Sequence, residues 1–141
     1  MTLHISGYAS LFGRRDMSGD IVLPGAFAAS LLAQSDRKFP MLLAHETERP
    51  VGVWDRVVED DKGLFVSGRL LSKTTRSRNA ARLVTERAVS GLSIGYRAGR
   101  HSRDRAGRRL SEIDLFEISV VAFPMLRDAR ITHIEQLKEK T

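Results

Sequence analysis

The sequence predicts an α+β fold, built on a mostly antiparallel sheet that closes on itself, with two helices inserted between strands. Most segments alternate apolar and polar residues with the two-residue period of a strand, and only two stretches favour a helix. Clusters of turn-forming residues separate the strands. The chain has 141 residues and a hydrophobic content of 42%, the size of one globular domain with one core, so we expect residues 1–141 to form a single domain.

The N-terminal segments predict two strands and a helix. Residues 3–12 alternate as a strand does, and the polar turn at 14–20 leads to a short strand at 21–23. Pro24 then opens a helix that continues to Gln34, because proline lacks an N–H that the first helical turn does not need. Its apolar side is expected to contain Phe27, Leu31 and Leu32.

The middle of the chain predicts three strands followed by a second helix. The strands cover residues 39–45, 51–59 and 64–71. Residues 60–63 (Asp-Asp-Lys-Gly) have the composition of a hairpin connection between the last two strands. Residues 73–89 then follow helical periodicity, with arginine and lysine on the exposed side.

A long hairpin is expected in the C-terminal part. Its strands cover residues 91–98 and 110–123, and Pro124 ends the second strand. The tail at 128–140 is compatible with either a terminal strand or a helix.

The basic charge of the chain is concentrated between the two strands of this hairpin. The net charge is +6 and the isoelectric point is about 10.3. Six arginines lie between residues 97 and 109: Arg97, Arg100, Arg103, Arg105, Arg108 and Arg109. We expect a mobile loop that contributes to partner binding rather than to chemistry. Arginines at this density could also neutralise phosphates, but residues 97–111 contain no aromatic residue that would stack on bases.

Several functional classes are excluded by composition. The chain has no cysteine, which excludes disulfides, cysteine-ligated zinc and a thiol nucleophile, and which suits a cytosolic protein. It has no apolar stretch of 18 residues and no basic-then-apolar N-terminus, so we expect neither a membrane span nor a secretory signal. It has no His-x-His, His-Glu-x-x-His or clustered Asp/Glu pattern, so we expect no metal.

Three polar residues interrupt or end apolar runs, and together they have the side chains of an acyl-transfer site. Ser93 lies in Gly91-Leu92-Ser93-Ile94-Gly95-Tyr96. His45 ends the run at 39–45, and Glu117 interrupts the run at 113–121. A carboxylate among apolar residues is costly unless it is paired. The three residues are therefore candidates for one site, provided that the fold brings them together.

The segment around Ser93 also matches Gly-x-Ser-x-Gly, the nucleophile elbow of α/β-hydrolases. That motif needs a sharp turn between a strand and a helix, with an acid and a histidine following the serine. Here Leu92, Ile94 and Tyr96 alternate straight through the serine, and no suitable acid and histidine follow. Ser93 is therefore expected within a strand, and the α/β-hydrolase interpretation is rejected.

Each candidate also has an ordinary structural interpretation. Ser93 could be a simple strand serine, His45 a hydrogen-bonded residue at a strand end, and Glu117 a solvent-facing residue. Asp114 and Glu46 compete with Glu117 for the role of the acid, although Asp114 lies nearer the arginine-rich loop and Glu46 points away from His45 if the strand continues. The remaining histidines are weaker candidates, because they lie near a terminus or among arginines: His4, His133 and His101.

Six segments in order along the chain share the pattern of one family. They are Gly7-Tyr8-Ala9 with Asp16 and Gly19-Asp20; Val22-Leu23-Pro24-Gly25-Ala26-Phe27; Met41-Leu42-Leu43-Ala44-His45 with Pro50-Val51-Gly52; Gly63-Leu64-Phe65-Val66 with Gly68; Gly91-Leu92-Ser93-Ile94-Gly95-Tyr96; and Leu115-Phe116-Glu117-Ile118-Ser119-Val120-Val121 followed by Pro124. Together they resemble the tailed-phage prohead (procapsid) maturation proteases, including their gene-transfer-agent relatives. That family is similar to the herpesvirus assemblins.

The resemblance implies both a fold and a set of roles. The assemblin fold is a closed barrel of about seven strands wrapped by a few helices. The implied serine endopeptidase uses His45 as general base, Ser93 as nucleophile and Glu117 as the third member, in place of the second histidine of the assemblins, and it needs no metal or cofactor. The family usually has Pro-Ala-Asn where this chain has Pro124-Met125-Leu126-Arg127. Arg127 is a candidate for the oxyanion hole, which the sequence leaves unassigned.

The resemblance also implies where and on what the protein acts. The implied substrates are the scaffolding segment of the major capsid protein and other internal proteins, cut inside the procapsid in the cytoplasm of the bacterial host, with self-cleavage. Contact with the portal protein and a homodimer are left open, and neither a membrane nor nucleic acid is required. The alternative from a different class is a non-catalytic scaffold or a basic nucleic-acid-binding module of the capsid assembly.

Overall fold

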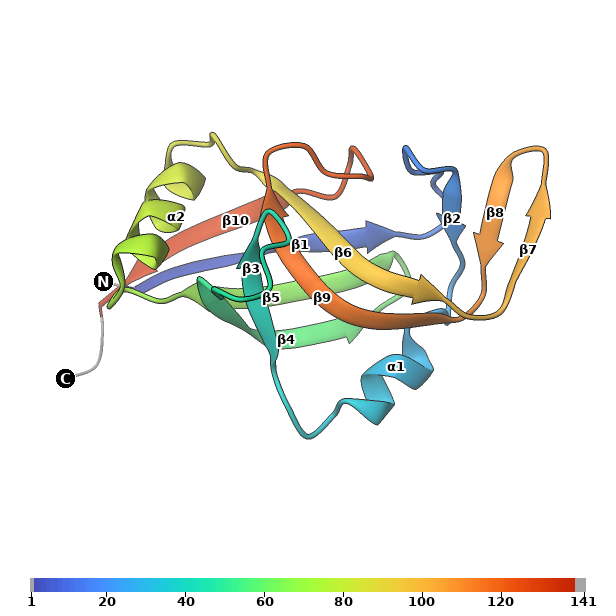
Figure 1. Cartoon of the computed structure of the whole chain (residues 1–141), viewed down its shortest axis with the longest axis horizontal. Coiled ribbons are helices and arrows are strands. Elements are labelled where there is room, and N and C mark those ends of the chain that lie inside the picture. The colour runs from blue at the N-terminus through green and yellow to red at the C-terminus, as the bar shows by residue number, and fades with distance from the viewer. Residues whose placement is uncertain (1, 139–141) are drawn as a thin grey trace.

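The computed structural model describes residues 2–138, within which ten strands and two helices are found (Figure 1). Seven strands form one strongly curled sheet, in the order β10 (Ile131–Leu137), β1 (Thr2–Leu11), β5 (Gly63–Leu70), β4 (Gly52–Glu59), β3 (Phe39–Leu43), β9 (Ile113–Val121) and β6 (Gly91–Ala98). A second sheet of three strands contains β2 (Asp20–Val22), β8 (Gly107–Leu110) and β7 (His101–Asp104). The helices are α1 (Ala28–Ala33) and α2 (Thr75–Thr85). Neither helix is long and apolar enough to cross a membrane.

The predicted closed antiparallel barrel is wrong, because the large sheet is a curled, open half-barrel. Within the described residues, β6 and β10 are its edges, and β3 and β9 pair in parallel, while the other neighbouring strands are antiparallel. Near these edges the chain forms one isolated bridge, between Gly91 of β6 and Arg130, which directly precedes β10. Beyond that bridge, side chains of β6 and β1 line a cavity instead of forming further ladder pairs. The space that a closed barrel would seal is therefore the site described below.

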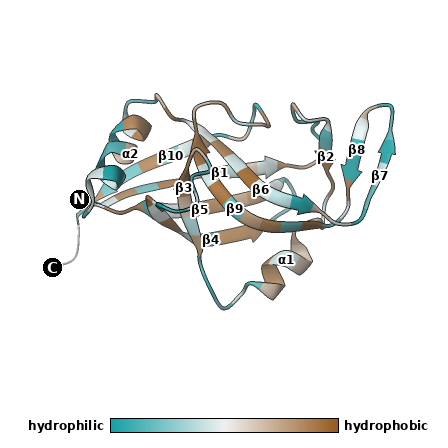
Figure 2. Ribbon diagram, in the orientation of Figure 1, coloured by the Kyte–Doolittle hydropathy of each residue, from teal (hydrophilic) through white to brown (hydrophobic). Residues whose placement is uncertain are grey.

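The core lies in the concave side of the curled sheet, as the alternating sequence of the strands predicts. β1 shows the pattern most clearly, because alternate residues from Leu3 onward are buried. Trp54 of β4 is 1% exposed, and its indole N–H donates to the carbonyl of Ile118 on β9 at 3.1 Å. Figure 2 shows apolar residues concentrated on the central strands and polar residues on the small hairpin at one end.

The helices are shorter than predicted. The first begins at Ala28 rather than at Pro24, because Gly25 has a φ of +90° and the chain turns there before the helix starts. Phe27 is buried as expected, but Leu32 is 77% exposed and lies outside the apolar side predicted for this helix. The second helix begins after Thr74, whose side chain accepts a hydrogen bond from the N–H of Ser77, an N-cap that sets its start.

The arginine-rich segment is a regular β-hairpin rather than the loop predicted from its composition. β7 and β8 pair across a tight turn in which Asp104 Oδ1 accepts from the N–H of Ala106 at 2.8 Å. β8 also pairs in parallel with β2, which is the basis of the second sheet. These strands could not be predicted from the sequence, because β7 is exposed along its whole length and therefore has no apolar alternation. β9 covers 113–121 of the strand expected at 110–123, whose first residue, Leu110, ends β8 instead, and the tail forms β10.

Candidate active site

Ser93 lies within β6, as the sequence predicted, and not on a strand-to-helix turn. It is 6% exposed and lines the cavity between β6 and β1. Its register partner on β9 is Ser119, so both hydroxyls are on the same face of the sheet. Among the described residues, no hydrogen-bond partner is found for the Ser93 hydroxyl. It is therefore a hydroxyl at the wall of a cavity, free to meet a ligand.

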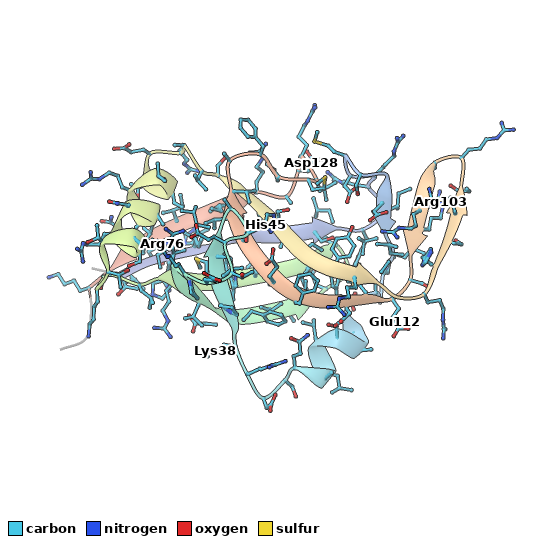
Figure 3. The ribbon with its side chains drawn as sticks, in the orientation of Figure 1. Lys38, His45, Arg76, Arg103, Glu112 and Asp128 are labelled. Carbon is cyan, nitrogen blue, oxygen red and sulfur yellow. The ribbon has the colours of Figure 1, made fainter. Side chains whose placement is uncertain are left out.

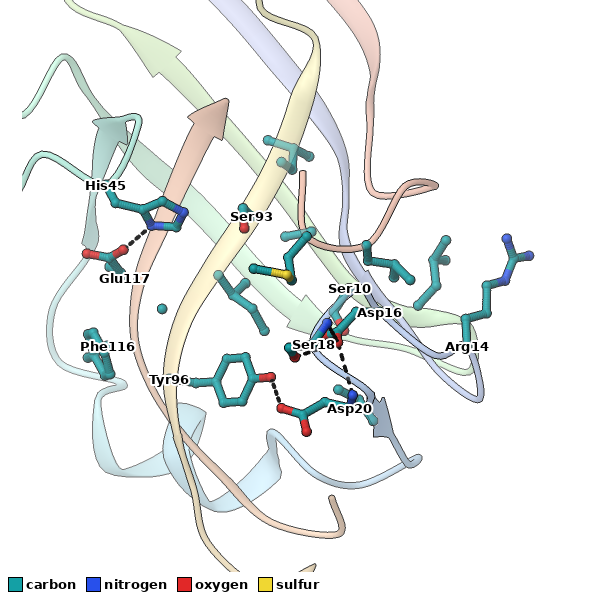
Figure 4. A pocket seen from close by; sticks show the side chains of 18 residues that line it. Ser10, Arg14, Asp16, Ser18, Asp20, His45, Ser93, Tyr96, Phe116 and Glu117 are labelled. Atoms are coloured by element: carbon teal, nitrogen blue, oxygen red, sulfur yellow. Dashed lines mark hydrogen bonds and ion pairs between the residues drawn. The ribbon is translucent and has the colours of Figure 1, made fainter. Parts of the chain in front are cut away.

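His45 follows the end of β3 in a turn, whereas the sequence predicted that the strand continued through it. Ala44 and His45 have φ values of 52° and 62°, in the left-handed region that residues with a Cβ seldom adopt. The turn is held by three hydrogen bonds: Ala44 N–H to the carbonyl of Val120 at 2.9 Å, Glu46 N–H to the carbonyl of Leu43 at 3.1 Å, and His45 N–H to Ser119 Oγ at 3.0 Å. The turn directs the imidazole toward β9 and β6 (Figure 4).

Glu117 extends from β9 toward the histidine, and its Oε1 is hydrogen-bonded to Nδ1 of His45. The residue is 6% exposed, so this contact provides the partner that a buried carboxylate requires. In Figure 4 the His45 ring lies between Glu117 on one side and Ser93 on the other. The structure thus brings together the three residues that the sequence singled out. Their catalytic roles remain a prediction.

Gly95 was not among the predicted site residues, yet it makes room for the Glu117 carboxylate. Gly95 is the register partner of Glu117 on β6. A Cβ placed at Gly95 would lie 2.1 Å from Cγ of Glu117 and 2.6 Å from its carboxyl carbon. Any side chain at this position would push Glu117 away from His45. The signal was present in the sequence, because Gly95 closes the motif around Ser93.

The competing carboxylates do not contact His45 in the described part of the chain. Glu46 turns toward α2, where its Oε2 is hydrogen-bonded to Arg76. Asp114 is exposed and is the register partner of Arg97. Figure 3 shows Arg76 on α2, on the side of His45 away from the small hairpin. Glu117 is therefore the carboxylate that could orient the imidazole.

The remaining histidines and Arg127 do not line the cavity that Ser93, His45 and Glu117 share. His101 is exposed on β7, and its Nδ1 contacts the carbonyl of Gly99 at 2.8 Å. His4 and His133 belong to β1 and β10, and neither lines the cavity. Arg127 is exposed and also lies outside the cavity lining, which instead includes its neighbours Met125 and Leu126. Arg127 is therefore poorly placed for the oxyanion role considered from the sequence.

The cavity has a volume of about 340 Å³ and extends from His45 and Ser93 to a polar network at the base of the small hairpin. Asp20 of β2 is 6% exposed and accepts two hydrogen bonds from the guanidinium of Arg108, both at 2.9 Å. Tyr96 of β6 donates its hydroxyl to the same carboxylate at 2.5 Å. These bonds hold one side of the cavity wall in place.

The ionisation of this network follows from its contacts. The hydrogen bonds from Arg108 hold the pKa of Asp20 below its ordinary value, against the opposing effect of burial. Burial, followed by the hydrogen bond to Asp20, raises the pKa of Tyr96, so the phenol keeps its proton. Asp20 and Tyr96 belong to the family's sequence pattern, but their contact with each other was not predicted. No group of three or more histidine, aspartate or glutamate side chains suited to a metal occurs among residues 2–138.

Comparison with known sequences points to one family. The family model described as caudovirus prohead serine protease matches residues 1–141. The chain is 38% identical over 135 residues to the prohead protease of Enterobacteria phage HK97. That match covers 93% of this chain and 60% of the relative, so the chain spans about 60% of the length of that protein.

Comparison with solved structures shows the same fold in two viral proteins. The Kaposi's sarcoma-associated herpesvirus protease, in complex with a hexapeptide phosphonate inhibitor, matches with a TM-score of 0.67 and 14% identity over 96% of this chain and 66% of that chain. The capsid assembly protease of bacteriophage T4 matches with a TM-score of 0.66 and 9% identity over 84% of this chain and 80% of that chain. At such identities the likeness establishes the fold alone.

Proposed function

The chain belongs to the caudovirus prohead serine protease family, and we propose that it is a serine endopeptidase that uses Ser93, His45 and Glu117. One observation carries this proposal: a buried carboxylate contacts the imidazole of His45 beside a cavity that the Ser93 hydroxyl also lines. A hydroxyl, a base and an orienting acid are the side chains required for acyl transfer.

The contact between His45 and Glu117 determines which nitrogen can act as the base. An ionised carboxylate only accepts hydrogen bonds, so Nδ1 of His45 carries the proton that it donates to Glu117. Nε2 is then free to take the proton of Ser93 as Oγ attacks the scissile carbonyl. The imidazolium formed at that step is stabilised by the Glu117 carboxylate. Nε2 returns the proton to the leaving amine, and water attacks the acyl-enzyme in the second half of the reaction.

The position of the cavity supports a peptide substrate. Its walls are partly apolar, with Leu92, Ile94 and Leu126, and its far end is polar. A side chain next to the scissile bond would occupy this space while its carbonyl lies against Ser93. Backbone N–H groups near Ser93 would stabilise the oxyanion.

We propose substrates on the basis of the family. They are the scaffolding segment of the major capsid protein and other internal proteins of the procapsid, cut inside the particle in the host cytoplasm. Self-cleavage is part of the same proposal, as is contact with the portal protein or with a second copy of the chain.

The test combines a chemical probe with the natural substrate. The protein is treated with a fluorophosphonate: Ser93 Oγ forms a bond to phosphorus, fluoride leaves, and His45 accepts the hydroxyl proton. Wild-type protein should be labelled on Ser93 and should shorten its own capsid protein, whereas Ser93→Ala should do neither. Ser102→Ala, which removes an exposed hydroxyl on β7, is the matched control and should behave as wild type.

The same assay contains the outcome that would overturn the proposal. Processing of the capsid protein by Ser93→Ala at the wild-type rate would remove Ser93 from the reaction. A protein that is not labelled and does not process, but binds heparin in a salt-sensitive manner through its arginine hairpin, would favour the non-catalytic scaffold or nucleic-acid-binding alternative.

A further inference from the structure

We propose that Ser119 is a positioning residue that fixes the backbone of His45 and thereby sets the approach of its imidazole to Ser93. The inference rests on the proposed function and adds to it a residue that touches neither substrate nor reacting atoms. Ser119 is fully buried, at 0% exposure, and its Oγ accepts the hydrogen bond of the His45 N–H at 3.0 Å.

The turn that carries His45 requires such a restraint. Two successive residues with a Cβ, Ala44 and His45, are held at positive φ, which is uncommon and persists only where the surroundings enforce it. The bonds before and after His45 are between backbone groups, from Ala44 to Val120 and from Glu46 to Leu43. The bond at His45 itself is the one supplied by a side chain. A substitution can therefore remove it while the backbone bonds on either side remain.

The position of Ser119 in the sheet lets its hydrogen bond set the placement of His45 relative to Ser93. β9 lies between β3, which leads into His45, and β6, which carries Ser93. Ser119 is the register partner of Leu42 on one side and of Ser93 on the other. Its hydroxyl thus ties the backbone of the base to the strand position directly opposite the nucleophile.

Glu117 and Ser119 act on His45 in complementary ways. They are two residues apart on β9, so their side chains are on the same face of the sheet. Glu117 is bonded to the imidazole, and Ser119 is bonded to the backbone N–H of the same residue. With both bonds present, β9 fixes the ring at its Nδ1 and the main chain at its nitrogen. Without Ser119, the turn can move while the imidazole follows Glu117, and Nε2 loses its alignment with Ser93.

Ser30 of α1 provides a matched control, because its side chain is bonded to the same strand, β9. It is 7% exposed, and its Oγ accepts the N–H of Leu115 on β9 at 2.9 Å. Ser30→Ala and Ser119→Ala therefore each remove a buried serine hydroxyl that accepts a backbone N–H. Ser30 Oγ also accepts a hydrogen bond from Nε2 of Gln34 at 3.0 Å, but none of its bonds leads to His45, whereas the bond of Ser119 does. A loss common to both variants reports on packing and stability, whereas a loss confined to Ser119→Ala reports on positioning.

The experiment measures fluorophosphonate inactivation as a maximal rate and a half-saturating concentration, together with amide hydrogen exchange and melting temperature. For Ser119→Ala we expect the maximal rate to fall about 10- to 100-fold, as a small misplacement of reacting groups does, with the half-saturating concentration unchanged. The His45 amide should exchange faster than in wild type and in Ser30→Ala. In a His45→Ala background, Ser119→Ala should cause no further loss, because it acts through the imidazole.

Equal maximal rates for Ser119→Ala and Ser30→Ala, in folded proteins, would overturn the inference. So would a further loss in the His45→Ala background. If Ser119→Ala does not fold, Ser119→Cys keeps the shape with a weak acceptor and carries the same expectation. Wild-type protein that is not labelled at all refutes the proposed function and, with it, the positioning role of Ser119. The exchange data still report the bond in that case, so the two failures are distinguishable.

Discussion

Two buried carboxylates lie at opposite ends of the same cavity, and they have very different partners. Glu117 and Asp20 are each 6% exposed. Glu117 contacts His45, whose side chain is 43% exposed and stands on a turn with positive φ. Asp20 is held by Arg108 and by the hydroxyl of Tyr96. Burial is the same at both ends, so the partner decides what each carboxylate can do.

The partners differ in whether they can exchange a proton. An imidazole has one nitrogen that can accept a proton and one that can donate, so the Glu117 end can take part in proton transfer. An arginine stays charged at every accessible pH, so the Asp20 end can only hold its geometry. Its contacts join β2, β6 and β8, and thus attach the second sheet to the large one. We therefore predict that substitutions at the Glu117 end of the cavity reduce activity and that substitutions at the Asp20 end reduce stability.

The largest effect is expected at the His45 end. His45→Ala removes the proposed base and should lower the fluorophosphonate inactivation rate by about 10⁴- to 10⁶-fold, the range seen when members of such a triad are removed. The side chain is partly exposed and fills no core space, so the melting temperature should stay close to wild type. A large drop in melting temperature with little loss of reactivity would reverse the roles assigned to the two ends.

A smaller loss of activity is expected at the acid. Glu117→Gln keeps the size of the side chain but removes the charge that stabilises the imidazolium, and should reduce the inactivation rate by about 10²- to 10⁴-fold. Asp114→Asn and Glu46→Gln are matched controls, because neither carboxylate contacts His45 in the described structure. Normal activity of Glu117→Gln, beside an inactive control variant, would move the assignment of the acid. If all three variants stay active, the site is a dyad of Ser93 and His45.

At the other end, Arg108→Met should reduce stability rather than activity. It leaves Asp20 buried without its cationic partner, and we expect a loss of about 2–3 kcal/mol in the free energy of unfolding, typical of hydrogen bonds to a charged group. Denaturant unfolding measures this loss, and fluorophosphonate inactivation of the folded variant should stay near wild type. Arg109→Met is the control, since its ion pair with Asp104 is on the surface.

The loss caused by Arg108→Met should depend on pH in a defined direction. In the folded protein the Arg108 bonds hold the pKa of Asp20 below its unfolded value of about 3.9. The charged carboxylate therefore stabilises the wild type above that pH, and this stabilisation is lost as the pH falls through the folded pKa. The stability difference between wild type and Arg108→Met should accordingly be full near pH 7 and should shrink below about pH 4. A difference that is constant down to pH 2 would mean that Arg108 acts through packing alone.

The two ends were not equally predictable from the sequence. Ser93, His45 and Glu117 stood out because each breaks an apolar run, and the pairing of β6 with β9 explains how distant residues meet. The turn at His45 could not be read from the sequence, because its positive φ values depend on bonds from β9 that only the folded chain provides. Local alternation predicts a strand that continues through that point.

The contact between Asp20 and Arg108 was not predicted, for a related reason. Arg108 was grouped with five other arginines by composition, although its two bonds to Asp20 set it apart from them. Sheet closure was overestimated because alternation in single strands says nothing about whether the last strand meets the first. Edges that line a cavity and edges that pair have the same apolar pattern.

The smallest effect is expected at the tip of the arginine hairpin. Arg103 and Arg105 are exposed residues near the tip of the hairpin, which projects from the body of the protein in Figure 3. Replacing both with serine should change the free energy of unfolding by less than about 0.5 kcal/mol and leave fluorophosphonate inactivation unchanged. Retention on heparin should decrease, because binding to a polyanion depends on the number of accessible cations. Loss of inactivation in the folded double variant would place the hairpin tip in the active site, and unchanged retention would remove it as a partner-binding element.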